Sequence, residues 1–279
     1  MKDSKWFPGH MKKALEDIEE KQLKPADLIL YVIDSRAPFS CINPLAEKIV
    51  HGKKIVYVFN KCDLADEKRT KQVADQFKKE GKSVVLVSAN NQKFKKDIKS
   101  AIMSAMKDKL ENRANKSINY VTKIIVLGVP NTGKSTLINL LCGSNKAKTG
   151  NIAGVTRFNT WQKVDDTMAM LDSPGILWPR FEGETASNLA FIGCLSDKEF
   201  DMADMGYELM KKLFEILGNE FFEKFNISQK EDVEFIEIYD ELCLKKNFKI
   251  KGGEIDYARA GKSFVDDFRA GKFGRITLE

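Results

Sequence analysis

The sequence predicts an α/β fold with a mostly parallel sheet and helices on both faces, followed by a small all-α domain. Two observations support this prediction. Up to residue 172, polar, lysine-rich segments of helical spacing separate apolar strand-like segments, which are LILYVI, IVYVF, SVVLV and TKIIVLG. Beyond Pro179 this alternation stops, and residues 182–244 contain no convincing strand. The chain is therefore expected to divide into residues 1–178 and residues 179–279.

Local patterns predict the individual elements. Apolar residues at helical spacing predict a helix over 9–23, and Pro25 ends it. The other elements expected around the four apolar strands are three helices, over 66–80, 93–111 and 135–143, and two strands, over 158–164 and 168–171. Residues 258–279 are expected to form a last basic helix and a loose terminus.

Composition and charge exclude several function classes. No apolar run approaches the ~20 residues that a membrane helix needs, and the N-terminus has no apolar signal core. The five cysteines form no CxxC pair, which favours reduced thiols in a cytoplasm over a disulfide framework. Residues 1–180 carry 32 basic and 19 acidic side chains, residues 181–244 carry 5 and 16, and residues 245–279 carry 9 and 5. The basic regions favour a polyanionic partner, although a solvated surface explains the charge equally well.

The strongest motif is GVPNTGKS, residues 128–135, which matches GxxxxGK[ST] between a strand and a helix. The backbone N–H groups of such a loop wrap phosphates. Lys134 would reach the β and γ oxygens, and Ser135 would bind Mg²⁺. The nucleotide contacts expected here are Asn131, Thr132, Gly133, Lys134, Ser135 and Thr136.

A second motif, DSPG, follows a later apolar strand. In this position Asp172 would reach Mg²⁺ through water, and the Gly175 N–H would meet the γ-phosphate. DSPG by itself also makes a good turn, so its place after the phosphate loop and a strand gives it weight.

Two further motifs predict recognition of guanine. In NKCD, the carboxylate of Asp63 can accept both N1–H and the 2-amino hydrogens of guanine, a pattern that adenine does not offer. The stem of Lys61 would cover the base, and Asn60 would tie this loop to the phosphate loop. One strand–helix unit later comes SAN, which is Ser88, Ala89 and Asn90, where the Ala89 N–H could bind guanine O6.

These four motifs are the parts of a Ras-like GTPase, but the guanine-reading pair precedes the phosphate-binding pair. With FPGHM at the start and DSRAP after the first strand, the sequence resembles the circularly permuted GTPases of the ribosome biogenesis GTPase A (YlqF/RbgA) family over the whole chain. The resemblance implies a circularly permuted P-loop GTPase domain. It also implies GTP hydrolysis coupled to late assembly of the bacterial large ribosomal subunit, with 23S rRNA and ribosomal proteins as partners.

The first switch segment is expected within residues 143–159, where Thr156 is the best candidate for the threonine that binds Mg²⁺ and the γ-phosphate. Thr149 and then Thr160 are the alternatives. The GxPNxGKS pattern resembles GTPases that bind K⁺ through Asn131, and such a cation could neutralise developing charge. A loop asparagine chosen for turn geometry is the alternative.

The residue after DSPG is Ile176, where Ras-type enzymes place a glutamine that orients the attacking water. An aliphatic chain cannot hold water, so slow turnover is expected unless a partner supplies another group. His10 is the candidate, because a neutral imidazole can accept a hydrogen bond from water. The family resemblance supports this role, while helix capping, RNA contact and a domain interface stay open.

The basic segment 93–116 and the basic tail are expected to contact RNA through phosphate and shape. No membrane contact is expected, and the resemblance favours RNA over DNA. Two other functions compete with a ribosomal switch GTPase. One is a small-molecule kinase that uses the same phosphate loop, and the other is an RNA-binding protein without turnover.

Overall fold

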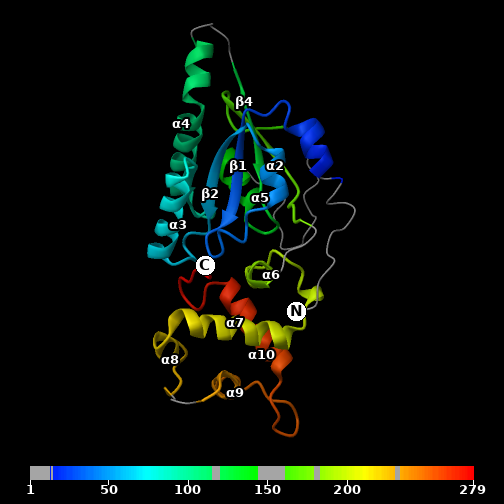
Figure 1. Ribbon diagram of the computed structural model, residues 1–279, viewed down its shortest axis with the longest axis vertical. Coiled ribbons are helices and arrows are strands. Elements are labelled where there is room, and N and C mark those ends of the chain that lie inside the picture. The colour runs from blue at the N-terminus through cyan, green and yellow to red at the C-terminus, as the bar shows by residue number, and fades with distance from the viewer. Residues whose placement is uncertain (1–12, 14, 115–119, 144–160, 179–182, 230–232) are drawn as a thin grey trace.

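A computed structural model describes residues 13, 15–114, 120–143, 161–178, 183–229 and 233–279 of the chain. It places an α/β domain above a helical domain in the orientation of Figure 1. The last strand of the sheet ends at Asp172, and the next described element is the helix α6 (Gly183–Phe191).

The sheet of the described chain has six strands in the order β3-β2-β1-β4-β6-β5. Every neighbouring pair is parallel except β5 and β6, so the predicted mostly parallel sheet is confirmed. The strands are β1 (Leu28–Asp34), β2 (Lys54–Asn60), β3 (Ser83–Leu86), β4 (Thr122–Leu127), β5 (Gln162–Lys163) and β6 (Met168–Asp172). Strand β5 covers only the end of the predicted segment 158–164, whose first three residues lie outside the described part of the chain.

Helices cover both faces of the sheet, as predicted. Alternate residues of β1 point to opposite faces, and all seven are buried. Leu28, Leu30 and Val32 pack with α4 (Lys95–Ala114) and α5 (Lys134–Cys142). Ile29, Tyr31 and Ile33 belong to the other cluster, which includes residues of α2 (Pro44–Ile49) and α3 (Glu67–Lys79). Short turns of η1 (Ile18–Gln22) and η2 (Gln92–Phe94) complete this domain.

The helical domain is built around two long amphipathic helices. Helix α7 (Met202–Leu217) crosses α10 (Tyr257–Arg269) where Gly206 faces Gly261, and the absence of side chains there lets the backbones approach. The other elements of this domain are η3 (Asp197–Glu199), α8 (Glu220–Phe225) and α9 (Phe235–Lys245). Within the described residues after 183, the β pairing is a single isolated bridge between Lys249 and Ile255.

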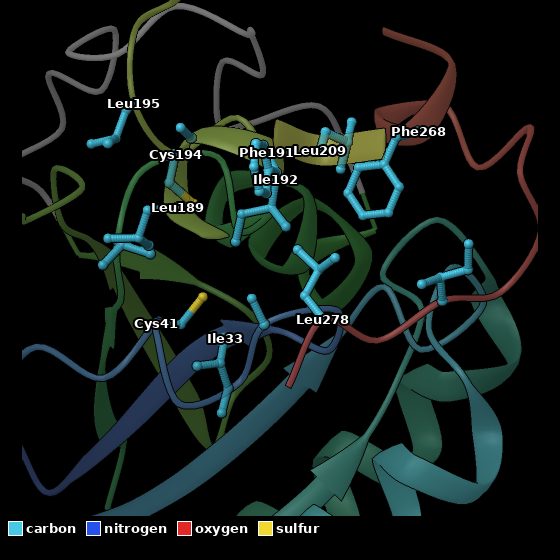
Figure 2. Close-up of a cluster of buried hydrophobic side chains, with 14 of the residues drawn as sticks. Ile33, Cys41, Leu189, Phe191, Ile192, Cys194, Leu195, Leu209, Phe268 and Leu278 are labelled. Atoms are coloured by element: carbon cyan, nitrogen blue, oxygen red, sulfur yellow. The ribbon is translucent and has the colours of Figure 1, made fainter. Parts of the chain in front are cut away.

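The cores of the two domains join. The second cluster of buried side chains continues from the sheet into the helical domain, so the two packed domains share one apolar interface. Figure 2 shows side chains from both sides of this junction, among them Ile33, Cys41, Leu189, Phe191, Ile192, Cys194, Leu195, Leu209, Phe268 and Leu278.

The expectation of a loose terminus is wrong. After α10 the chain returns to the junction of the domains (Figure 1), where Ile276, Thr277 and Leu278 are 2%, 6% and 3% exposed. The two apolar residues Ile276 and Leu278 are the sequence signal for this burial. Among the described helices, none is long and apolar enough to cross a membrane.

Candidate nucleotide-binding site

Four predicted loops meet at the carboxyl ends of the parallel strands. The phosphate loop follows β4, DSPG follows β6, NKCD follows β2, and SAN follows β3. Ligands of open α/β sheets bind at this edge, because the loops after adjacent strands converge there.

Lys134 lies inside the phosphate loop. It is 6% exposed, and its Nζ donates to the carbonyl oxygens of Gly128 (3.1 Å) and Val129 (2.8 Å). The hydroxyl of Thr132 donates to the same Val129 carbonyl at 3.0 Å. Burial lowers the pKa of Lys134 to about 8. The loop therefore holds a cation whose charge an anionic ligand would favour.

Ser135 and Asp172 face each other across the site. The Ser135 Oγ donates to Asp172 Oδ2 at 2.9 Å, whereas Asp172 Oδ1 is buried and has no hydrogen-bond partner. Burial raises the pKa of Asp172, which is 1% exposed. A buried carboxylate oxygen without a partner, next to a hydroxyl, fits the oxygen ligands that Mg²⁺ prefers.

Asn60 joins three of the loops. Its Nδ2 donates to the Thr132 carbonyl at 2.7 Å, and its Oδ1 accepts from the Ala89 N–H at 2.9 Å. Gly133, at φ +92°, lies below Asn60, and a Cβ there would come within 2.3 Å of Asn60 Nδ2. The predicted link between NKCD and the phosphate loop is confirmed. The Ala89 N–H, which is expected to bind guanine O6, donates to Asn60 Oδ1 in this structure. Guanine O6 would therefore compete with Asn60 Oδ1 for this N–H.

Lys61 crosses toward the phosphate loop. Its Nζ donates to the carbonyl of Asn131 at 2.7 Å and lies 2.8 Å from Asp34 Oδ2. Ser88 is buried, whereas Asp63 and Asn90 are exposed at the rim of the site. The structure thus leaves the Asp63 side chain accessible to a ligand.

Asp34 and Arg36 form a buried ion pair next to Lys61, and the sequence assigns them no role beyond the DSRAP motif. Asp34 is fully buried and accepts from Arg36 Nε (3.0 Å) and Nη2 (2.8 Å). Burial alone would raise the pKa of Asp34, but the charges of Arg36 and Lys61 hold it well below its usual range. The third nitrogen of Arg36 donates to the carbonyl of Arg269 at 3.3 Å. A buried charge network therefore connects Lys61 to the end of α10.

The DSPG segment lies against the phosphate loop. A Cβ on Gly175 would come within 2.6 Å of Pro130 Cα, so a side chain there would push the loops apart. Ile176 is 2% exposed; its N–H donates to the Gly128 carbonyl (3.3 Å), and its carbonyl accepts from Asn43 Nδ2 (3.2 Å). Ile176 is thus a packing residue of the junction and offers no group to water.

Asn131 reaches from the phosphate loop to the helical domain. Its Nδ2 donates to the carbonyl of Gly193 at 2.6 Å, which leaves the amide oxygen as the atom that can bind a cation. Thr136 follows Ser135 in α5 and is half-buried. His10, Thr149, Thr156 and Thr160 lie outside the described residues.

Residues 123–217 match the family described as 50S ribosome-binding GTPase. The match begins within β4, so the guanine-reading motifs precede it in this chain. The ribosome biogenesis GTPase A of Bacillus cereus is 35% identical over 277 residues, which are 98% of this chain and 93% of that protein. Mitochondrial ribosome-associated GTPase 1 of Mus musculus is 32% identical over 300 residues, covering 99% and 90%.

Two solved structures have the same fold over nearly the whole chain. The GDP-bound structure of TM YlqF has a TM-score of 0.65 and 26% identity, covering 93% of this chain and 97% of that one. The GNP-bound structure of YlqF from T. maritima has a TM-score of 0.63 and 26% identity, covering 96% and 97%. A guanine nucleotide is thus bound by proteins of this architecture.

Proposed function

The chain belongs to the ribosome biogenesis GTPase A family, and we propose that its GTP hydrolysis is slow alone and is accelerated by a precursor of the large ribosomal subunit. It is a GTP-hydrolysing ribosome biogenesis factor. The observation that carries the assignment is the 2.7 Å bond from Asn60 to Thr132. This bond joins a guanine-reading loop and a phosphate loop that are 72 residues apart and occur in permuted order.

In the proposed site, Asp63 accepts the N1–H and 2-amino hydrogens of guanine, and Lys134 binds the β and γ oxygens. Ser135 binds Mg²⁺ directly, and Asp172 binds it through water, which would satisfy the partnerless Oδ1. A Mg²⁺ held by these residues would supply positive charge beside the phosphate oxygens. Thr156 is proposed as the switch threonine, and Asn131 as the ligand of a K⁺ that assists in the same way.

The attacking water needs a group other than Ile176, whose side chain is buried among apolar residues. We assign this role to His10, which a ribosomal particle would hold near the γ-phosphate. The imidazole would accept a hydrogen bond from the water and hold it in line for attack. Turnover would then depend on the partner.

The RNA-contacting surface is proposed on η2 and α4. Lys93, Lys96 and Lys107 are exposed there, and phosphate contact needs only such accessible cations. The basic residues of the tail are less available, because Arg269 pairs with Asp197 (2.8 Å) and Arg275 bonds within the chain. We also propose that the helical domain moves with the nucleotide state, since the chain enters it directly after DSPG. A role on ribosomal precursors would put the protein in the cytoplasm.

Hydrolysis of GTP and ATP, measured with and without large-subunit precursor particles and in K⁺ or Na⁺, tests the proposal. GTP turnover should be slow alone and should rise with particles in K⁺. His10→Ala should abolish the stimulation without loss of particle binding. His51→Ala is the matched control, because His51 is exposed in the turn before β2. If particles still stimulate GTP hydrolysis by His10→Ala, the catalytic role proposed for His10 is wrong.

The same measurement separates the competing functions. A preference for ATP, or transfer of phosphate to a small acceptor, would favour a kinase. Nucleotide binding with no turnover, even on the particle, would favour an RNA-binding protein.

A further inference from the structure

The loop that carries Asp63 has an unusual partner. Arg275, which follows α10, spreads its guanidinium over this loop: Nε donates to the Ala65 carbonyl (2.9 Å), and Nη2 to the Cys62 carbonyl (3.1 Å). Its Nη1 donates to Glu67 Oε2 at 3.3 Å. The three acceptors bracket Asp63 on both sides in the sequence.

The residues after Arg275 extend this contact. The Ile276 N–H donates to the Leu64 carbonyl, and the Asp66 N–H donates to Thr277 Oγ1, both at 3.1 Å. The Leu278 N–H then donates to the Arg36 carbonyl at 2.7 Å. We call residues 275–278 the strap. It lies across both the guanine-reading loop and the DSRAP loop.

The strap supplies what the loop itself lacks. Residues 61–66 form no helix or strand. Within the loop the Leu64 N–H donates to the Lys61 carbonyl (2.9 Å), and the other backbone polar groups need partners from elsewhere. The carbonyls of Cys62, Leu64 and Ala65 and the Asp66 N–H find those partners in the strap. Asp63 alone projects to solvent from a segment that is otherwise fixed. A binding carboxylate must be held within roughly 0.5 Å of its productive position, and these bonds set that position.

We propose that the strap is a positioning element for guanine recognition, through which the helical domain sets the affinity and the base selectivity of the nucleotide site. This inference rests on the proposed role of Asp63 in reading guanine. The coupling is reciprocal, so a bound guanine nucleotide must also stabilise the strap on its loop. The helical domain thereby senses the base, in addition to any signal from the phosphates.

Binding of GDP, IDP and ADP to the full chain tests the proposal. IDP keeps the phosphates and N1–H of GDP but lacks the 2-amino group, so the ratio of the two dissociation constants reports the position of Asp63. Arg275→Ala should weaken GDP binding roughly tenfold and lower the preference for GDP over IDP. Arg275→Lys should restore only part of both. Arg259→Ala is the matched control, since Arg259 donates to Asn247 within the helical domain.

A second variant and a second measurement keep the proposal testable if Arg275→Ala does not fold. Thr277→Val removes the contact with Asp66 at nearly constant size, and it should shift the GDP/IDP ratio in the same direction if Arg275→Ala does not fold. GDP should also slow hydrogen exchange at the Ile276 and Leu278 amides, which a merely structural strap would not show.

The failures are distinguishable. A wild-type protein that binds GDP no better than IDP and ADP would overturn the reading of guanine by Asp63. A wild-type preference for GDP that persists unchanged in both Arg275→Ala and Thr277→Val would overturn the strap proposal alone. An equal loss in Arg259→Ala would do the same.

Discussion

Replacing Asp34 by alanine should destabilise the α/β domain by about 3–5 kcal/mol, because it leaves the Arg36 and Lys61 side chains without their carboxylate partner. The Asp34 carboxylate accepts from Arg36 at 3.0 and 2.8 Å and lies 2.8 Å from the Lys61 ammonium. Arg36 is 2% exposed, so water cannot replace the lost carboxylate. The loss should be close to the full cost of a buried charge without its partner.

Urea unfolding followed by circular dichroism measures this change. Asp75→Ala is the control, because it breaks a pair with Lys78 whose side chains are 63% and 55% exposed. That variant should lose less than about 1 kcal/mol. The double substitution Asp34→Leu with Arg36→Met should recover much of the stability, since it removes the buried guanidinium together with its carboxylate.

An unfolding free energy of Asp34→Ala within about 1 kcal/mol of the wild type would refute the reasoning. It would mean that Arg36 finds adequate partners at the end of α10. The variant should also bind GDP more weakly, because Lys61 loses the anchor that holds its stem beside the base.

Three further predictions follow from single residues. Burial lowers the pKa of Lys134 to about 8, and bound phosphates favour its charged form. GDP binding must therefore take up a proton above pH 8. The affinity for GDP, measured by calorimetry, should fall between pH 8 and 9 but stay constant from pH 6 to 7. In Gly261→Ala the new Cβ would lie 1.9 Å from the Met202 carbonyl oxygen, so α7 and α10 must separate. The unfolding free energy should fall by roughly 1–3 kcal/mol, and calorimetry should show a lower Tm. An unchanged Tm would contradict this packing. Asn131→Ala should equalise the GTPase rates in K⁺ and Na⁺, and a K⁺ advantage that persists would exclude the asparagine as its ligand.

Local patterns suffice for the sheet and for the four loops. Each strand is a short apolar run followed by turn residues, and parallel strands bring those turns to one edge. The link from Asn60 to the phosphate loop is predictable for the same reason, since both loops leave the same edge, after strands β2 and β4 that only β1 separates. The permuted order does not hide the site, because the order of the chain does not change the neighbours in the sheet.

The buried charges and the strap could not be predicted, because their partners are remote. Arg275 bonds carbonyls 210 and 213 residues away, and Arg36 bonds one 233 residues away. In the sequence Arg275 looks like an RNA-binding cation of the basic tail, and Arg36 is only one letter of the DSRAP motif. Their main partners include backbone carbonyls, which leave no trace in residue type.

A loop from the first part of the chain and a phosphate loop from its middle should form one guanine-specific site. Asp63→Asn tests it most directly, because an amide can donate to the C2 carbonyl of xanthine but no longer accepts both guanine hydrogens. Binding of GDP and XDP should be measured on this variant and on the wild type. The variant should prefer XDP over GDP, while the wild type should prefer GDP. A variant that keeps the wild-type preference for GDP would contradict it.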